Sequence, residues 1–448
     1  MLRESDNSMT SIGPTAITHP GSIGKRPTAM PEFRANGGQQ TGTMYADSAT
    51  SVIPTVPAGL LPDATAGCTS QSGQSLSASQ WKLLERGIRQ RFEAVSACLD
   101  EIVRLRSVPA FLKQCPFLTA QIGSMLTPLS EISRSDIAWT WLGSTDVHFS
   151  CSGELTVLDH NFSLPTGMDR LVVNNDAVAL RDDLFPCAAS DASLNAMTDT
   201  AVLTPGFYSS TFRENEFLAR CLNAHLARSC DLAVKNDGVF LQHGGKLTRI
   251  SRIVRRIDDD LIDPNCFRPD SLVGVPGLVR AWKNGLVTVV NPPGSGFANA
   301  RSFGQYIPQM IREWLGEEPL LESARVLECD DPEVLRTIMA NVRSYVIRTN
   351  DPLHPARPFF GSTGTAFEFA DLLRRIRANP SAYVARRLLP GLEDPGVNLR
   401  LYATLGRRFR LARSCIRRAC QPDGGAPLSI GPDETISVMS AFQDRGRS

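Results

Sequence analysis

The sequence contains no run of eighteen apolar residues, so we expect no membrane span. It also shows no excess of charge of one sign, since 47 lysine and arginine residues balance 46 aspartate and glutamate residues. Such a balance disfavours wholesale binding to nucleic acids or anionic membranes. The first residues lack the apolar segment of a signal peptide and include Glu4 and Asp6. We therefore expect a cytoplasmic protein with neither a nucleic-acid partner nor a membrane partner.

Common catalytic and metal-binding motifs are also missing. The eleven cysteines include no Cys-x-x-Cys pair, and the closest two are Cys415 and Cys420, so we expect reduced thiols and no zinc site. There is no Gly-Lys-Ser/Thr phosphate loop and no Gly-x-Ser-x-Gly nucleophile turn. The sequence therefore gives no sign of a P-loop enzyme or of a serine hydrolase.

Composition divides the chain into three parts. Residues 1–76 are rich in Ser, Thr, Gly, Pro and Ala without a lasting hydrophobic period, which predicts a disordered tail. From Ser77 to about Arg104, apolar residues recur every three or four positions, which predicts an amphipathic helix. Strand-like and helix-like segments then alternate, which indicates an α/β or α+β domain over 77–420. We expect residues 421–448 to be poorly ordered.

Two β-prone segments, 138–149 and 155–161, are joined by a Gly-containing turn and predict a hairpin. Asp146 lies on the first strand, and Asp159 and Asn161 share one face of the second because they are two residues apart. Two carboxylates and an amide oxygen are hard ligands that suit Mg²⁺ held beside phosphate. The alternative is a hairpin whose polar residues only face water. The spacing alone favours this alternative over a metal site.

The densest charge cluster runs from Arg255 to Gly277 and follows the apolar run Leu247–Val254, so it begins where a buried strand is expected to end. In open α/β sheets, ligands bind at the carboxyl ends of strands. The cluster therefore suggests a ligand site, and the alternative is a solvated loop with local ion pairs.

Two further segments suggest anion binding. The loop Asn291–Gly296 precedes a predicted helix and could present the N–H groups of Gly294 and Gly296 to phosphate, with Arg301 beyond them. Seven arginines in the nineteen residues from Arg400 could bind phosphate or nucleic acid. Each signal is weak alone. For the arginine-rich segment we prefer the alternative interpretation, in which the arginines lie on an exposed face of a sheet or helix.

One long pattern joins these segments. Its parts are Leu203-Thr204-Pro205-Gly206, Arg255-Arg256-Ile257-Asp258-Asp259-Asp260, Phe267-Arg268-Pro269-Asp270-Ser271, Gly274-Val275-Pro276-Gly277, Pro293-Gly294-Ser295-Gly296 and Leu315-Gly316-Glu317-Glu318-Pro319. With these segments the chain resembles the circularly permuted ATP-grasp proteins, the type related to glutathionylspermidine synthetase. The agreement is strongest over 204–319 and extends over roughly 77–401.

The resemblance implies an ATP-grasp fold of the α+β class, with mixed and antiparallel sheets flanked by helices and a cleft between two lobes. It implies ATP and Mg²⁺ as cofactors. The implied reaction activates a small-molecule or peptide carboxylate as an acyl phosphate and joins it to an amine. The positions carried over from the family are Asp146, Asp159 and Asn161 for Mg²⁺, Arg301 and Arg348 for phosphate, and Arg400 for phosphate or the acyl phosphate.

The chain departs from the family pattern at several of these positions. Asp159 stands where the family has glutamate, and Arg301 and Arg348 stand where it has lysine. The glycine-rich loop expected after Arg348 is replaced by Asp351–Gly361, whose three prolines lack N–H donors. Two hypotheses follow. One is a divergent ATP-dependent carboxylate–amine ligase, in which the residues facing the donor or acceptor substrate would be Arg256, Asp258, Asp259 and Arg268. The other is a degenerate ATP-grasp protein that acts as a binding or regulatory partner of a protein encoded nearby.

Overall fold

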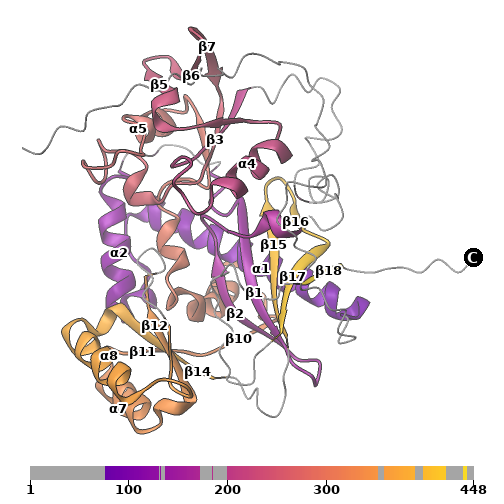
Figure 1. Cartoon of the computed structure of the whole chain (residues 1–448), viewed down its shortest axis with the longest axis vertical. Coiled ribbons are helices and arrows are strands. Elements are labelled where there is room, and N and C mark those ends of the chain that lie inside the picture. Colours follow the sequence, from indigo (N-terminus) through magenta and orange to yellow (C-terminus); the bar gives the residue numbers. More distant parts are fainter. Residues whose placement is uncertain are drawn as a thin grey trace, which may run out of the picture. The chain divides into compact units, whose positions relative to one another are not determined.

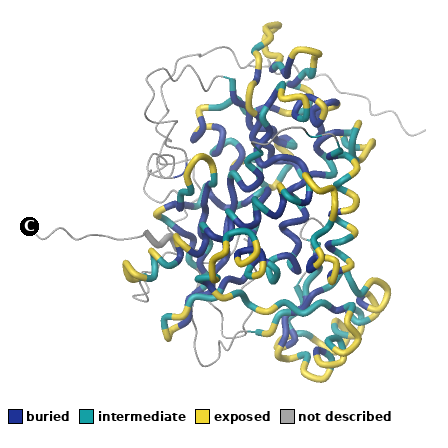
Figure 2. The backbone as a smooth tube through the Cα atoms, turned by 180° about the vertical axis from the view of Figure 1, so that it is seen from behind, coloured by how far each residue is buried: buried dark blue, intermediate teal, exposed yellow. Residues whose placement is uncertain are grey.

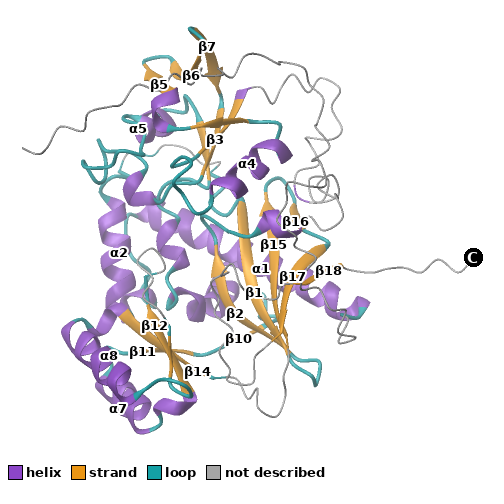
Figure 3. Cartoon of the chain, viewed as in Figure 1, coloured by secondary structure: helices purple, strands orange, loops and turns teal. Residues whose placement is uncertain are grey.

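The computed structural model describes residues 76–130, 132, 137–171, 184, 199–351, 358–388, 397–419 and 437–440. The predicted tails, 1–76 and 421–448, lie almost wholly outside these residues. Within the described part, helices combine with parallel and antiparallel sheets, in agreement with the expected α+β class (Figures 1 and 3). None of the described helices is long and apolar enough to cross a membrane.

The helix predicted from Ser77 is α1 (Ala78–Leu105). Its first turn is closed by a capping box, in which the Ser77 hydroxyl accepts from the Gln80 N–H at 3.2 Å and the Gln80 side chain accepts from the Ser77 N–H at 2.9 Å. The apolar face predicted by the hydrophobic period is buried in the main core. This face consists of Leu84, Ile88, Phe92, Val95, Leu99 and Ile102.

The largest sheet contains the predicted hairpin, which is thereby confirmed. β1 (Leu142–Phe149) lies between β2 (Leu155–Asn161) and β15 (Val397–Leu405) and is antiparallel to both. The strand order is β10–β2–β1–β15–β17–β18, and β16 also pairs with β15. The remaining strands are β10 (Glu322–Ser323), β16 (Phe409–Leu411), β17 (Ser414–Ala419) and β18 (Ser437–Ser440).

A parallel sheet carries the start of the charge cluster. Its order is β4–β3–β8–β9, and helices α4 and α5 connect β3 to β4 and β8 to β9. β8 ends at the buried Arg255, so the cluster begins at the carboxyl end of a parallel strand, as predicted. The elements are β3 (Thr200–Leu203), α4 (Phe212–Cys221), β4 (His225–Ala227), β8 (Arg252–Arg255), α5 (Leu278–Lys283) and β9 (Thr288–Val290).

The apolar run Leu247–Val254 does not form one strand. It is divided at Ser251, because β7 (Lys246–Ile250) belongs to a small antiparallel sheet with β5 (Leu232–Lys235) and β6 (Gly238–His243). The exposed β6–β7 turn lies at the edge of the main core. Figure 2 shows how burial varies along the chain, with buried residues in dark blue at the centre of the molecule and exposed residues in yellow, many of them at turns.

The last sheet is antiparallel, with the order β11–β14–β12–β13, and it shares a separate core with α7 and α8. Its elements are β11 (Val326–Glu328), α7 (Pro332–Ala340), β12 (Tyr345–Thr349), β13 (Phe359–Phe360), α8 (Ala366–Ala378) and β14 (Tyr383–Arg387). Two further α-helices are α2 (Pro116–Leu126) and α6 (Ile307–Met310), and a π-helical turn (Ile311–Leu315) continues α6; short 3-10 helices occur between the other elements.

Candidate functional site

The end of the β1–β2 hairpin brings three charged residues into one row. Asp146 on β1 lies directly opposite Asp159 on β2 and, on its other side, opposite Arg400 on β15. Residues that are paired across neighbouring strands point to the same face of a sheet. The register therefore places two carboxylates and a guanidinium side by side, although Arg400 is far away in the sequence.

Arg400 holds Asp146 through two parallel bonds. Its Nε donates to Oδ1 and its Nη2 to Oδ2, both at 2.7 Å. This fork geometry is the strongest form of an arginine–carboxylate pair. Burial alone would lower the pKa of Arg400, but the adjacent Asp146 carboxylate raises it above its ordinary value. The guanidinium is therefore charged at any pH at which the protein is folded.

Two other arginines reach Asp159. Nη1 of Arg301 donates to Oδ2 at 2.5 Å, and Nη1 of Arg348 donates to the same oxygen at 3.4 Å. Oδ1 accepts from the N–H of His160 at 3.0 Å. Burial raises the pKa of Asp159, but the two guanidiniums outweigh burial and bring the pKa below its ordinary value. Burial and the neighbouring Arg301 lower the pKa of Arg348 to about 9.

Asn350 connects the backbone segments that carry these two arginines. The Arg301 N–H donates to the Asn350 carbonyl at 3.1 Å, and the Ser302 N–H donates to the Asn350 side chain at 3.0 Å. The Arg301 Nε also donates to the carbonyl of Thr349, the last residue of β12, at 3.1 Å. The position of Arg301 relative to Arg348 is thus fixed by main-chain and side-chain contacts. Sequence analysis missed Asn350, which carries no recognisable local signal.

We call Asp146, Asp159, Arg301, Arg348 and Arg400 the hairpin-end cluster. It contains three of the predicted phosphate or substrate residues and two of the three predicted metal ligands. The exposed fractions of its side chains lie between 9% and 20%, so the cluster is largely buried but still reaches solvent.

The third predicted metal ligand, Asn161, serves the turn after β2. Its Oδ1 accepts from the N–H groups of Ser163 at 3.2 Å and Leu164 at 2.8 Å, and its Nδ2 donates to the Leu164 carbonyl at 3.0 Å. This is a local turn of the type that Asn side chains commonly stabilise. The amide is therefore fully used by its own chain segment.

These contacts bear on whether the predicted ligands fit Mg²⁺. Each side-chain oxygen of Asp146, Asp159 and Asn161 already accepts a hydrogen bond from an arginine or from a backbone N–H. A divalent cation at the two carboxylates would also lie against guanidinium groups. No group of three or more His, Cys, Asp or Glu side chains suited to a metal occurs in the part of the chain that the structure describes. The donor set in this arrangement does not fit Mg²⁺, and we derive no chemical step through the ion.

The other face of the hairpin is a buried polar support. His160 lies between Nη1 of Arg91 at 3.2 Å and the Thr145 hydroxyl at 3.1 Å, and its ring stacks on Phe162. Burial, and then the charge of Arg91, bring the pKa of His160 well below its ordinary value. Because arginine can only donate, Nε2 of His160 is the acceptor and Nδ1 carries the proton. His160 therefore supports β2 from the face opposite to Asp159.

A second interaction network holds the glycine-containing loop that was expected to bind phosphate. Asp259 Oδ2 accepts from the N–H groups of Gly294 at 3.2 Å and Gly296 at 2.7 Å. Asp259 Oδ1 lies 2.7 Å from Nη2 of Arg255, whose guanidinium also donates to the carbonyls of Asn291, Ile257 and Pro292. The N–H groups assigned to phosphate are thus directed at a carboxylate in the structure. The assignment itself stays a prediction.

The other predicted substrate-facing residues lie in three different environments. Arg256 is buried, donates to Asn215 Oδ1 at 2.9 Å, and lies 3.6 Å from Glu214. Arg268 is half-exposed and pairs with Asp270 at 2.8 Å. Asp258 is half-buried, and none of the described residues donates a hydrogen bond to its carboxylate. Burial, which outweighs the opposing effect of Arg255, raises its pKa to about 6, and Asp259, Asp260 and Asp351 contribute in the same direction.

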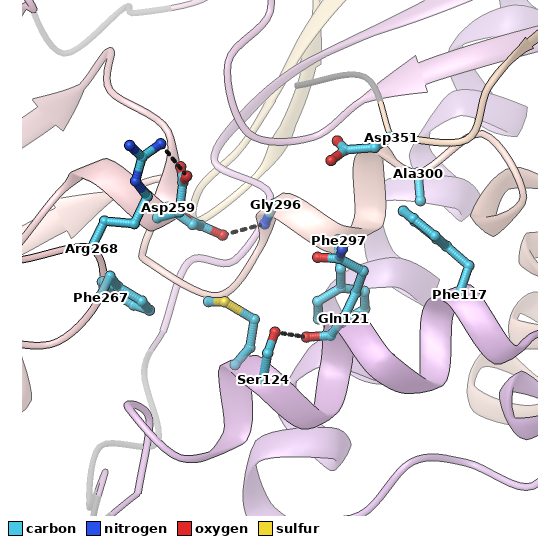
Figure 4. Close-up of a pocket in the computed structure, with 12 residues that line it drawn as sticks. Phe117, Gln121, Ser124, Asp259, Phe267, Arg268, Gly296, Phe297, Ala300 and Asp351 are labelled. Carbon is cyan, nitrogen blue, oxygen red and sulfur yellow. Dashed lines mark hydrogen bonds and ion pairs between the residues drawn. The ribbon is translucent and has the colours of Figure 1, made fainter. Parts of the chain in front are cut away.

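A cavity of about 230 Å³ adjoins this network (Figure 4). Two of its lining residues, Ala300 and Asp351, are the chain neighbours of Arg301 and Asn350. The structure thus brings Asp259 and Arg268 to the cavity, whereas Arg256 and Asp258 do not line it. The apolar lining consists of Phe117, Met125, Phe267, Phe297 and Ala300, and the charged lining of Asp259, Asp260, Arg268 and Asp351.

Asn291 is a further buried residue that sequence analysis treated only as part of a loop. Its Oδ1 accepts from the Leu142 N–H at 2.9 Å, and its Nδ2 donates to the carbonyls of Leu142 at 2.6 Å, Phe162 at 2.7 Å and Ser163 at 3.0 Å. One side chain thus connects the end of β9 to the start of β1 and the end of β2. The only local hint is its place before two prolines, which lack the N–H groups needed to continue a strand.

Comparison with known proteins gives the family. Residues 75–419 match the family described as circularly permuted ATP-grasp type 2. Among curated proteins, the chain is 28% identical over 329 residues to the uncharacterized protein sll0335 of Synechocystis, covering 69% of this chain and 68% of the relative. It is 28% identical to two uncharacterized Mycobacterium tuberculosis proteins, Rv2411c over 362 residues and Rv2567 over 374 residues. The match to Rv2411c includes 75% of this chain and 63% of the relative, and the match to Rv2567 includes 80% of this chain and 41% of the relative. The chain belongs to the circularly permuted ATP-grasp type 2 family.

Proposed function

We propose that this chain is a divergent ATP-dependent ligase that joins a carboxylate to an amine. The observation that carries the proposal is the convergence of Arg301, Arg348 and Arg400 on two facing carboxylates, in a member of a family whose name indicates ATP-grasp chemistry. Guanidinium groups bind phosphate oxygens through charge-assisted hydrogen bonds and stabilise the negative charge that develops in phosphoryl transfer. The closer relationship to glutathionylspermidine synthetase is part of this proposal.

The proposed reaction has two steps. A carboxylate oxygen attacks the terminal phosphorus of ATP, ADP leaves, and an acyl phosphate forms. The amine nitrogen then attacks the acyl carbon, inorganic phosphate leaves, and the nitrogen loses a proton. In the first step the arginines of the hairpin-end cluster would orient the transferred phosphoryl group and offset its charge.

The cavity provides a place for the second substrate. Three of its lining residues are carboxylates, and only one lining residue, Arg268, is cationic. Arg255 neutralises Asp259 from outside the cavity. The remaining negative charge and the aromatic walls suit an amine that is carried on an apolar body, because a protonated amine is attracted both by carboxylates and by aromatic faces. We therefore propose that the cavity binds the acceptor amine.

A second candidate function is binding without catalysis. It is favoured by the contacts of Asp259 with Gly294 and Gly296, which use N–H groups that a phosphate-binding loop would present to a nucleotide. In that case the chain would be a binding or regulatory subunit with an ATP-grasp fold.

Trapping of the activated carboxylate tests the proposal. The full chain is incubated with ATP, magnesium salt, hydroxylamine and a panel of amino acids and short peptides, and ADP and hydroxamate are measured. Hydroxylamine replaces the unknown amine, so carboxylate activation is detected by itself. We expect ADP and hydroxamate with at least one carboxylate, a loss of at least tenfold in Arg348→Gln, and no change in Arg312→Gln, whose exposed side chain pairs with Glu318. ATP binding without either product for any carboxylate would overturn the ligase proposal in favour of the second candidate.

A further inference from the structure

The hairpin-end cluster has more positive than negative groups. Three guanidiniums, from β15, β12 and the segment after Ala300, face two carboxylates. Arg386 adds positive charge near Arg348 and contributes to the lowering of its pKa. The cluster therefore repels a divalent cation and attracts an anion.

The cluster also retains hydrogen-bond donors. A guanidinium has five N–H groups in a planar fork that matches the oxygens of a phosphate. Within the described residues, Arg301 donates hydrogen bonds from Nε and Nη1, and Arg348 donates one from Nη1. Their side chains are 14% and 13% exposed, so both arginines still reach solvent.

We propose that the hairpin-end cluster binds a polyphosphate group through its arginines without a divalent metal ion. Asp146 and Asp159 act as internal counter-ions, which hold the guanidiniums in place and compete with the ligand for them. This inference takes its ligand class from the proposed function but does not depend on ligation.

The role of Asp159 distinguishes this site from a magnesium site. If Asp159 were a metal ligand, its replacement by asparagine would weaken polyphosphate binding, because a bridging ion would be lost. In an arginine site the same change removes a competing negative charge and releases N–H donors of Arg301 and Arg348. The two roles predict effects of opposite sign for a single, nearly isosteric substitution.

The experiment measures binding of tripolyphosphate to the full chain by calorimetry, once in EDTA and once with excess Mg²⁺, and repeats both with ATP. No carboxylate or amine is present, so failure of ligation does not affect the result. Because Mg²⁺ binds tripolyphosphate and reduces its charge, we expect equal or weaker binding with Mg²⁺. We expect Asp159→Asn to tighten binding at least threefold in EDTA and Arg348→Gln to weaken it at least tenfold.

Two further variants complete the design. Asp146→Asn should also tighten binding, which keeps the test decisive if Arg348→Gln does not fold. Asp371→Asn, on the exposed surface of α8 where it pairs with Arg374 and Arg375, should leave binding unchanged. The inference is overturned if Mg²⁺ tightens binding tenfold or more and Asp159→Asn abolishes that gain, or if tripolyphosphate does not bind in EDTA. Binding of ATP but not of tripolyphosphate would equally overturn it, since recognition would then lie in the nucleoside.

Discussion

At the scale of single residues, the acidic run after β8 shows how three consecutive aspartates differ. Asp259 is buried, lies 2.7 Å from Arg255 and accepts hydrogen bonds from the N–H groups of Gly294 and Gly296, whereas Asp260 lies 3.7 Å from the half-exposed Arg268. Asp258 differs from both, because it is half-buried and none of the described residues donates a hydrogen bond to its carboxylate. Its pKa is raised to about 6 for this reason.

Asp258 should therefore decrease stability at neutral pH. Its pKa in the folded protein lies above its value of 3.8 in the unfolded chain, so the folded state binds the proton more tightly. The carboxyl group costs nothing below pH 3.8, and its cost grows as the pH rises through 6, to about 1–3 kcal/mol at pH 7.5. We expect Asp258→Asn to raise the free energy of unfolding by that amount at pH 7.5 and by much less at pH 4.

Denaturant unfolding at the two pH values measures this effect. Glu85→Gln, on the exposed side of α1, is the control and should change stability little at either pH. Equal effects of Asp258→Asn at both pH values would show that titration of this carboxyl is not involved.

At the scale of elements, the segment Arg255–Gly277 folds against itself with little regular structure beyond the end of β8 and the short 3-10 helix Asp259–Leu261. Asp263 caps α5, since its carboxylate accepts from the N–H groups of Gly277 at 3.0 Å and Val279 at 2.9 Å. The Val275 N–H donates to the Ile262 carbonyl at 2.8 Å, which draws Gly274 onto the backbone of Leu261 and Ile262. This packing explains why the segment forms a compact unit around its charges.

Gly274→Ala should be strongly destabilising. A Cβ atom at this position would fall within van der Waals contact of the Leu261 carbonyl oxygen and 2.8 Å from the Ile262 carbonyl carbon, and both are backbone atoms that cannot rotate away. We expect a loss of about 2–4 kcal/mol, as for other forced overlaps in packed regions. The control is Gly123→Ala inside α2, where no atom lies within 4 Å of the new Cβ. That change should stabilise the protein by roughly 0.5–1 kcal/mol. Thermal unfolding of both variants provides the measurement, and a neutral Gly274→Ala would show that the loop is not held this closely.

At the scale of the whole molecule, the largest sheet is built from segments that are distant in the chain. β1 and β2 come from the first half, β15 and β17 from the last quarter, and β18 adds to the edge through the pairing of Ser414–Arg417 with Ser437–Ser440. The arginine-rich segment from Arg400 is thus mostly sheet. Only Arg400 among its arginines belongs to the hairpin-end cluster.

Truncations test this organisation. Because composition predicts that residues 1–74 form no core, and because the family match begins at residue 75, we expect a chain that starts at residue 75 to unfold within about 2 °C of the full chain. Removal of residues 437–448 should lower the unfolding temperature by several degrees, since β17 would lose the hydrogen bonds to β18. A drop of several degrees in the first truncation would contradict the first expectation, and an unchanged unfolding temperature in the second would contradict the other.

The sequence by itself determined the local features of this protein. The helix from Ser77 to Leu105 follows from hydrophobic period and capping, the β1–β2 hairpin from β-prone residues around a glycine turn, and the family from a long continuous pattern. Each depends on residues that are close in the chain, so local chemistry is sufficient to predict it.

Only the tertiary structure decided which groups meet. The pairing of Asp146 with Arg400 depends on the register between β1 and β15, and the pairing of Asp159 with Arg301 and Arg348 depends on three separate chain segments. Asn161 was assigned to a metal through the family resemblance, and Gly296 to phosphate through its place in a loop before a predicted helix. Their hydrogen bonds go instead to neighbouring backbone and to Asp259. Long-range partners are selected by packing and charge over the whole fold, and no local pattern records them. For this reason the predicted magnesium site became, in three dimensions, a cluster dominated by arginine.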